Sequence, residues 1–410
     1  MATIHTLNAR EIRDSRGNPT IEVELESGRV KATASVPSGA SVGTHEALEL
    51  RDEGGSVSGA ISHVNEAIAR AVVGKTFDQQ GLDALLCELD GTPNKSMLGA
   101  NAILGVSIAF ARAEASERGE PLYAYLGSLD AQDSFTLPQP LFNVINGGKH
   151  AHHGIAMQES MLAPIGFESA RERVAAATAC VESLRLLLEE GGYGTSLGDE
   201  GGFAPALRNN EEALDLLASA IARAGYTTEQ IKIALDIAAS SFYTEGEYRL
   251  EAGEETQSFD RTRLLEWYAA IAKKYPLISI EDGFAEDDMD GFVALTRELG
   301  DRLSIVGDDF TVTNAERIGT VAGRKAANAC IIKPNQIGTI TETIEAVRAA
   351  RRAEWKVFAS HRSGETMDTF IADFAVGLSC DYLKAGAPTR PERLVKYNRL
   401  IEIEEELFAL

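Results

Sequence analysis

The tetrapeptide Ile233-Ala-Leu-Asp236 is a short apolar run that stops at an ionisable residue, and a segment with helical periodicity follows it. The second half of the chain repeats this arrangement. The later runs are Ile278-Ser-Ile-Glu281, Ile305-Val-Gly-Asp308, Ile331-Ile-Lys333, Val357-Phe-Ala-Ser-His361 and Tyr382-Leu-Lys384. Alternation of strand and helix is typical of parallel sheets, and a series of this length predicts a β/α barrel of the TIM type.

The region before these units is less regular. Two strand-like segments come without a helix between them, and two helical segments follow. They are, in chain order, Leu141–Asn146, Met157–Ala163, Ser169–Glu190 and Glu211–Ala224. We therefore expect an α/β fold built on an irregular ββαα(βα)6 barrel, whose second strand runs antiparallel to the others. An amphipathic helix over Glu392–Leu407, just after Pro391, should close it.

The first part of the chain has a different pattern. Apolar and polar residues alternate over residues 21–36, which predicts a small antiparallel sheet. Three helical stretches follow, near residues 60–73, 82–89 and 100–118. A sheet followed by helices is typical of an α+β domain. We interpret the polar segment Gly127–Ser134 as a linker, and expect a smaller α+β domain at 1–128 and a catalytic barrel at 137–410.

The composition narrows the class of protein. The net charge is -23, from 39 basic and 62 acidic residues, and such a surface repels nucleic-acid phosphates. No segment has the pattern of a membrane span or a secretion signal, so we expect a cytoplasmic protein. Four cysteines lack paired spacing and are interpreted as reduced core residues. They are Cys87, Cys180, Cys330 and Cys380.

Three of the apolar runs end on carboxylates, namely Asp236, Glu281 and Asp308. Reactive groups of β/α barrels lie at the carboxyl ends of the strands, so these side chains should converge. Hard oxygen ligands suit magnesium. A single acid at such a place can instead cap the following helix, but three in register favour a metal site. Asp282 and Asp309, which follow directly, are interpreted as supporting groups.

Two runs end on lysines that should lie beside these carboxylates. Crowding by metal ions and by Lys384 should disfavour the ammonium form of Lys333, which would leave its amine available as a general base. A lysine that only neutralises the carboxylates fits the spacing equally well. Sequence position leaves both interpretations open.

Two further acids are candidates for proton transfer. Glu200 lies in the glycine-rich segment Gly198-Asp-Glu-Gly-Gly202, and Glu159 begins a strand-like segment after Gln158. Paired carboxyl groups can share one proton, which makes one of them a general acid. An ordinary turn and a solvent-facing strand residue are the alternatives. The loop histidine His150 is expected to act on substrate, whereas His152 and His153 are expected to be exposed.

An anion site is predicted at His361-Arg-Ser-Gly-Glu-Thr366, which we expect to cross from a strand end to a helix start. Helix amides, the Arg362 guanidinium and the Ser363 hydroxyl would cradle a phosphate, with Lys384 nearby. A serine helix cap with an incidental arginine is the alternative. The small-residue loop Pro37–Glu46 is interpreted as a lid.

Longer motifs carry a resemblance to the enolase family, in family order over nearly the whole chain. They are Asp14-Ser-Arg-Gly-Asn-Pro-Thr20, Ser38-Gly-Ala-Ser41, Asn94-Lys-Ser96, Leu98-Gly-Ala-Asn-Ala-Ile-Leu-Gly-Val-Ser107, Gly198-Asp-Glu-Gly-Gly202, Asn335-Gln-Ile-Gly338, His361-Arg-Ser-Gly-Glu-Thr366 and Gly386-Ala-Pro388. The resemblance implies a glycolytic lyase that reversibly dehydrates 2-phosphoglycerate to phosphoenolpyruvate with two magnesium ions. It also implies a homodimer or a ring of dimers, without a nucleic-acid partner.

The resemblance also implies roles for single residues. The first magnesium would take Asp236, Glu281 and Asp308, and the second would include Ser41. The catalytic set would be Glu200, Lys333, Glu159 and His361, with Lys333 as the base and Glu200, backed by Glu159, assisting loss of the hydroxyl. Substrate would contact His150, Gln158, Glu159, Lys333, Arg362, Ser363 and Lys384.

Some positions depart from the family pattern, namely Val42, Ser160 and Ser241, and none of them removes a ligand or a proton carrier. A dehydratase or epimerase of the same superfamily that acts on another carboxylic acid is the alternative function. The predicted phosphate site and the lid serine argue against it.

Overall fold

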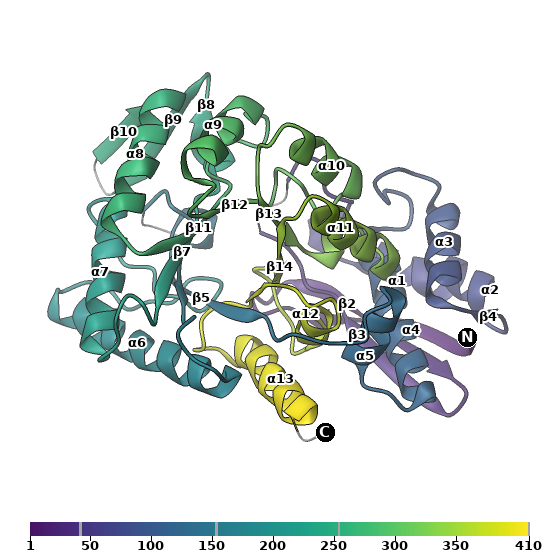
Figure 1. Cartoon of the computed structure of the whole chain (residues 1–410). Coiled ribbons are helices and arrows are strands. Elements are labelled where there is room, and N and C mark those ends of the chain that lie inside the picture. Colours follow the sequence, from purple (N-terminus) through teal and green to yellow (C-terminus); the bar gives the residue numbers. More distant parts are fainter. Residues whose placement is uncertain (41–42, 152–154, 253–254, 409–410) are drawn as a thin grey trace.

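The computed structural model of this 410-residue chain describes residues 1–40, 43–151, 155–252 and 255–408 (Figure 1). Eight strands close into a barrel in the order β11-β12-β13-β14-β15-β5-β6-β7. They are β5 (Gln139–Asn146), β6 (Glu159–Ala163), β7 (Lys232–Asp236), β11 (Leu277–Glu281), β12 (Ser304–Gly307), β13 (Ala329–Ile332), β14 (Lys356–Ser360) and β15 (Tyr382–Lys384). Strand β6 pairs antiparallel with both neighbours, and the other pairs are parallel.

Helices surround this barrel in the predicted order, two in succession and then one after each strand (Figure 1). They are α6 (Ala170–Glu190), α7 (Asn210–Arg223), α8 (Arg261–Lys274), α9 (Met289–Leu299), α10 (Ala315–Gly323), α11 (Ile340–Arg352), α12 (Phe370–Gly377) and α13 (Pro391–Phe408). Helix α6 begins with a capping box between Ser169 and Glu172, which explains its sharp start. The ββαα(βα)6 prediction, including the antiparallel second strand, is confirmed.

Alternation along the strands separates two apolar cores. On β13, Ala329 and Ile331 belong to the cluster inside the barrel, and Cys330 and Ile332 belong to the larger cluster outside it. Leu141, Met161 and Phe358 also lie in the inner cluster, which is packed with side chains. Successive side chains of a strand point to opposite faces, so the apolar runs can serve both cores at once. The filled interior leaves the polar strand ends as the place for chemistry.

The N-terminal part is an antiparallel sheet of order β3-β2-β1-β4, covered by helices. Its elements are β1 (Ala2–Arg13), β2 (Pro19–Ser27), β3 (Val30–Ser35), η1 (Glu53–Gly55), α1 (Ser58–His63), η2 (Val64–Ile68), α2 (Ala69–Val72), β4 (Thr76–Phe77), α3 (Gln79–Asp90), α4 (Ala100–Arg118) and α5 (Leu122–Leu129). The three predicted helical stretches are present, and α1, η2 and α2 form one run with a π-helical turn.

The proposed linker is wrong at its beginning, because residues 127–129 belong to helix α5. The polar composition of residues 127–134 led us to predict a linker where helix α5 ends. This helix packs against α12 of the barrel. At Gly127 an added Cβ would lie 2.5 Å from the Phe135 ring and 3.0 Å from the Gly377 carbonyl oxygen. Close helix packing therefore explains a glycine that the sequence presented as a linker residue.

The sequence also gave no sign of a second small sheet. Strands β8 (Tyr243–Thr244), β9 (Glu247–Ala252) and β10 (Glu255–Phe259) form an antiparallel excursion between β7 and α8. All four cysteines are free thiols, and three of them are buried. Among the helices described here, none combines the length and apolar character needed to cross a bilayer.

Contacts between the two parts bring the N-terminal loop to the barrel. Ser38 and Gly364 exchange two backbone hydrogen bonds of 2.8 Å each, and Arg112 of α4 donates to the Asp368 carboxylate from both terminal nitrogens. The start of the proposed lid is thereby fixed beside the predicted anion loop.

Candidate active site

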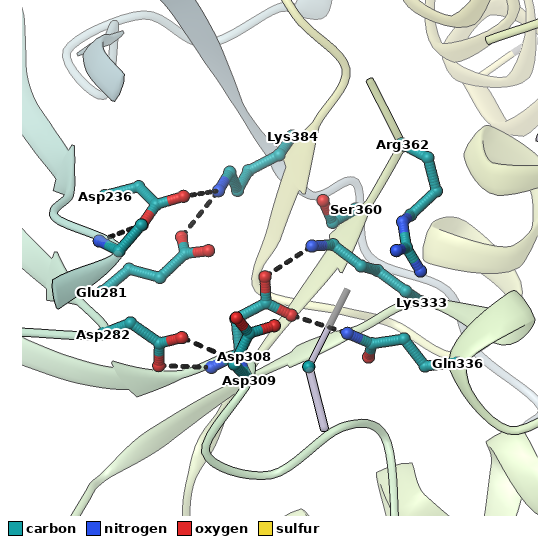
Figure 2. A network of polar contacts seen from close by, with 12 residues as sticks. Asp236, Glu281, Asp282, Asp308, Asp309, Lys333, Gln336, Ser360, Arg362 and Lys384 are labelled. Atoms are coloured by element: carbon teal, nitrogen blue, oxygen red, sulfur yellow. Dashed lines mark hydrogen bonds and ion pairs between the residues drawn. The ribbon is translucent and has the colours of Figure 1, made fainter. Parts of the chain in front are cut away.

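The carboxyl end of the barrel collects the predicted residues (Figure 2). Six strands end on an ionisable residue or directly before one. In chain order these residues are Asp236, Glu281, Asp308, Lys333, His361 and Lys384. Because β6 runs in the opposite direction, its first residue, Glu159, lies at the same end and is the register partner of Asp236.

One pocket opens at this end, between the barrel rim and the loops above it. Among its lining residues are His150, Gln158, Glu159, Glu200, Asp236, Asp308, Lys333, His361, Arg362 and Ser363. The structure thus brings together nearly all of the predicted residues that it describes. Glu281 and Lys384 are buried beside Asp236, and the Lys384 amine donates to Glu281 Oε2 at 2.6 Å. Ser41, Val42, His152 and His153 lie outside the described residues.

Each predicted metal ligand contacts one of the two lysines: Asp236 and Glu281 contact Lys384, and Asp308 contacts Lys333 (Figure 2). Lys384 Nζ lies 3.9 Å from Asp236 and 3.2 Å from Glu159 in addition to its bond with Glu281. Asp236 Oδ1 accepts the Ala238 N–H at 3.0 Å, which fixes the direction of that carboxylate. Asp308 accepts from Lys333 Nζ at 2.5 Å and from Gln336 Nε2 at 2.9 Å.

These residues fit a divalent cation. Glu281 Oε1 is buried and has no hydrogen-bond partner among the described residues, and an unsatisfied buried oxygen is costly. Burial and the charge of Asp236 raise the pKa of Glu281 well above its usual value, and burial raises the pKa of Asp236 as well. A bound cation would give the Glu281 oxygen a partner and would lower the pKa values of both carboxyl groups. The donors are hard oxygens, as magnesium requires.

Two clusters have potential ligand atoms within 4.8 Å of one another, among the residues described. They are His150–Glu159–Glu200 and Asp282–Asp308–Asp309. Of the three expected magnesium ligands, Asp308 belongs to the second of these clusters, and Asp236 and Glu281 belong to neither. In the arrangement seen here, Lys384 lies between Asp236 and Glu281 as their counter-charge.

Asp282 holds the backbone of the segment that carries Asp308 through two hydrogen bonds. Its φ is +42°, and its carboxylate accepts the backbone N–H groups of Asp308 at 2.9 Å and Asp309 at 2.8 Å. A non-glycine residue in this left-handed region is uncommon and is maintained by its surroundings. The side chain therefore sets the direction in which Asp308 leaves β12, which is the supporting position inferred for it.

Lys333 lies directly after β13, where a base is expected, and its amine forms an ion pair with Asp308. Burial acts to lower the pKa of its amine, but the charge of Asp308, with a further contribution from Glu281, raises the pKa overall. The lowering is expected for a lysine beside bound metal ions, and for that state it stays a prediction; the direct ion pair with Asp308 was not foreseen from the sequence.

The two predicted acids face each other across the pocket. His150 Nδ1 lies 3.6 Å from Glu159 Oε1 and 3.7 Å from Glu200 Oε1. Burial and the charge of Glu200 raise the pKa of Glu159 well above its usual value. For Glu200, burial acts to raise the pKa, but His361 and His150 more than offset it and the pKa is lowered. The opposite directions make Glu159 the more basic member of the pair.

Glycine-rich backbone explains how Glu200 reaches this position. Gly201 has a φ of +83°, and at Gly198 a Cβ would lie 2.6 Å from the carbonyl oxygen of His150. The turn packs directly on the loop that carries His150, so a side chain at Gly198 would displace it. Asn143 Nδ2 of β5 donates to Glu200 Oε2 at 3.0 Å and anchors the carboxylate.

The anion loop is present without the helix start that we expected. Helix α12 begins at Phe370, so residues 361–369 form a loop and their amides are not a helix N-terminus. The prediction failed because the Glu365 carboxylate binds the Arg362 and Thr366 N–H groups, which holds the loop in a tight turn. The Ser363 hydroxyl accepts the Ala40 N–H at 2.7 Å.

Two residues that contact the site, Glu46 and Gln336, were not predicted as site residues from the sequence. Glu46 Oε2 accepts from Arg362 Nη1 at 2.9 Å, and Glu46 Oε1 accepts the Gly43 N–H at 3.0 Å. Gln336 donates to both Asp308 and Glu46 and is visible beside Asp308 in Figure 2. Glu46 lies in the segment interpreted as a lid and Gln336 lies in a family motif, but nothing in the local sequence indicated their contacts.

Comparison with known families agrees with this architecture. Residues 4–126 match the family model described as the enolase N-terminal domain, and residues 134–409 match the enolase C-terminal TIM barrel domain. The chain belongs to the enolase family. Enolase domains indicate a lyase of the dehydratase type that acts on a small molecule, and members of the superfamily generally bind Mg²⁺.

Proposed function

We propose that this enolase-family chain reversibly dehydrates 2-phospho-D-glycerate to phosphoenolpyruvate with two magnesium ions. The observation that carries the proposal is the placement of a lysine and a carboxyl pair in one pocket. Lys333 lies beside the acidic rim, and Glu159 and Glu200 lie next to His150 and His361. A proton acceptor and a proton donor in one pocket suit removal of a C–H proton and of a hydroxyl group from neighbouring carbons.

The first half-reaction needs charge stabilisation. A proton next to a carboxylate is very weakly acidic, because its loss adds negative charge to an anion. Magnesium held by Asp236, Glu281 and Asp308, with a second ion near Ser41, would supply opposing positive charge. Lys384, buried among these acids, would bind the substrate carboxylate. Lys333 must give up its proton to act as a base, so its ion pair with Asp308 has to open before turnover.

The second half-reaction uses the carboxyl pair. A proton held on Glu159, the more basic member, would be available through Glu200 to the departing hydroxyl group. In the reverse direction the ionised Glu200 can accept a proton from water. His150 and Gln158 line the same pocket and would orient the substrate, and Arg362 with Ser363 would hold its phosphate.

The direct test is turnover by the purified chain. With 2-phosphoglycerate and magnesium, we expect the ultraviolet absorbance of the enol product to rise, and a chelator should abolish the rise. A chain that produces no phosphoenolpyruvate under these conditions, but converts a sugar acid from a comparison panel, would contradict the proposal and support the alternative superfamily activity.

Arg362→Met should weaken binding of the phosphorylated substrate. The guanidinium is buried and offers a planar fork to a phosphate. Loss of a hydrogen bond to a charged group costs about 1.5–3 kcal/mol, so the KM for 2-phosphoglycerate should rise about 10- to 100-fold. Steady-state kinetics would measure this, and circular dichroism would check the fold. An unchanged KM would remove the phosphate role from Arg362.

We also propose, from the family resemblance, that the chain works in glycolysis and gluconeogenesis in the cytoplasm, as a homodimer or a ring of dimers. Light scattering after size exclusion would measure the assembly, and a monomer at working concentration would contradict that part of the proposal.

A further inference from the structure

A fully buried arginine connects the two loops that carry the acid and the anion site. Arg393 lies in the first turn of α13, and no part of it is exposed. Its Nη2 donates to the carbonyl oxygens of Asp199 at 3.0 Å and Ser363 at 2.6 Å, and its Nη1 donates to that of Arg362 at 2.8 Å. Nη1 also lies 2.6 Å from His361 Nδ1.

The last contact determines the tautomer of His361. A guanidinium has five N–H donors and no acceptor, so the ring nitrogen facing it must offer a lone pair. Nδ1 is therefore bare, and a neutral ring carries its hydrogen on Nε2. That nitrogen lies 3.2 Å from Glu200 Oε2. Burial, with the charge of Arg393 acting in the same direction, lowers the pKa of His361 to about 4, although Glu200 opposes it.

The backbone makes room for this arginine. Gly386 has a φ of +84°, and a Cβ there would lie 2.8 Å from Arg393 Cδ and 2.7 Å from the carbonyl oxygen of Glu200. A larger residue at Gly386 would push the arginine away from His361. The turn that follows β15 and Lys384 therefore leaves the space that the Arg393 side chain occupies.

We propose that Arg393 is a positioning residue that fixes His361 in the Nε2–H tautomer, so that His361 acts as a hydrogen-bond donor to Glu200 and not as a proton acceptor. The inference rests on the proposed function for its catalytic meaning, and on the contacts of Arg393 for its geometry.

The arrangement assigns different tasks to the two oxygens of Glu200. Oε2 faces His361 Nε2 and accepts from Asn143 Nδ2, so it serves as the anchored oxygen. Oε1 faces His150 and, beyond it, Glu159. The oxygen that exchanges a proton with substrate is therefore Oε1, and Arg393 contributes by keeping the carboxylate from rotating.

The tautomer can be measured without turnover. In ¹⁵N-histidine-labelled protein with magnesium, long-range ¹H–¹⁵N spectra separate a bare Nδ1 from a protonated one, and His361→Gln identifies the His361 signals among the seven histidines. In the wild type we expect a bare Nδ1 and a protonated Nε2. In Arg393→Met, whose side chain cannot donate, this pattern should be lost, and Arg393→Lys should largely restore it. A protonated Nδ1 in the wild type would overturn the proposal.

Kinetics provide the functional half of the test. Arg393→Met should lower kcat about 10- to 100-fold with a smaller change in KM, comparable with the loss of a group that orients a metal-ligating histidine. Lysine at this position should recover part of kcat. An Arg393→Met protein that keeps both the tautomer and the wild-type kcat would refute the inference, and circular dichroism with thermal melting would check its fold.

Two substitutions at His361 avoid any dependence on Arg393→Met folding. A glutamine amide reaches the place of Nε2 and can donate to Glu200, whereas an asparagine amide reaches only the place of Nδ1. His361→Gln should therefore keep at least tenfold more kcat than His361→Asn, and the reverse order would overturn the proposal. If the wild type shows the expected tautomer but does not act on 2-phosphoglycerate, the proposed function fails while the role of Arg393 in setting His361 stands.

Discussion

Lys333→Ala should abolish both the dehydration of 2-phosphoglycerate and the exchange of its C2 hydrogen with solvent. Both processes begin with removal of the same proton, and Lys333 is the amine that lines the pocket next to Asp308. Loss of a general base typically costs about 10²- to 10⁴-fold in rate. Product absorbance would report dehydration, and loss of the C2 proton signal in heavy water by NMR would report exchange.

Glu200→Gln is the informative companion variant. The amide cannot deliver a proton to the departing hydroxyl, so dehydration should stop while exchange at C2 continues. Lys273→Ala removes an exposed lysine on α8 and should change neither rate. Exchange that persists in Lys333→Ala would contradict the assignment of the base, and exchange that disappears in Glu200→Gln would contradict the division between the two residues.

The barrel could be predicted because its physical signal is local. Each run such as Ile331-Ile-Lys333 places apolar residues alternately inside and outside the barrel and then exposes one polar group at the rim. Helix α5 and strands β8–β10 were missed for the opposite reason. A glycine at position 127 reflects close packing against Phe135 and Gly377, and that contact is not visible in local composition.

The site residues at strand ends could be predicted for the same local reason, but their partners could not. Glu46 and Arg362 are separated by 316 positions in the chain and still form a buried ion pair. Arg393 lies in an ordinary amphipathic helix, and its role depends on a histidine 32 positions earlier. Such contacts arise only when the N-terminal part, the barrel loops and α13 pack together.

Charge states are the part of the site that residue types predict least well. The amine of Lys333 is expected to lose its proton when bound metal ions and Lys384 surround it. In the structure the Asp308 carboxylate at 2.5 Å is the main group that opposes the effect of burial, and the pKa is raised overall. Distance to the nearest opposite charge decides the sign, and the sequence does not contain that distance.

Glu281→Gln should remove the stabilisation that magnesium confers on the folded chain. Glu281 is buried, its Oε2 accepts from Lys384, and its Oε1 has no hydrogen-bond partner among the described residues. A ligand that binds only the folded state at 100 times its Kd stabilises it by about 2.7 kcal/mol. The wild-type melting temperature should therefore rise with added magnesium and fall again with a chelator, and the variant should show little response.

Glu298→Gln makes the same charge change at an exposed position of α9, so it should keep the full response to magnesium. This control separates loss of a ligand from a general change in surface charge. Because the measurement needs no substrate, it tests the ion site independently of the reaction. A melting temperature that rises equally with magnesium in Glu281→Gln and in the wild type would mean that the ion binds elsewhere, and the assignment of Asp236, Glu281 and Asp308 as its ligands would be wrong.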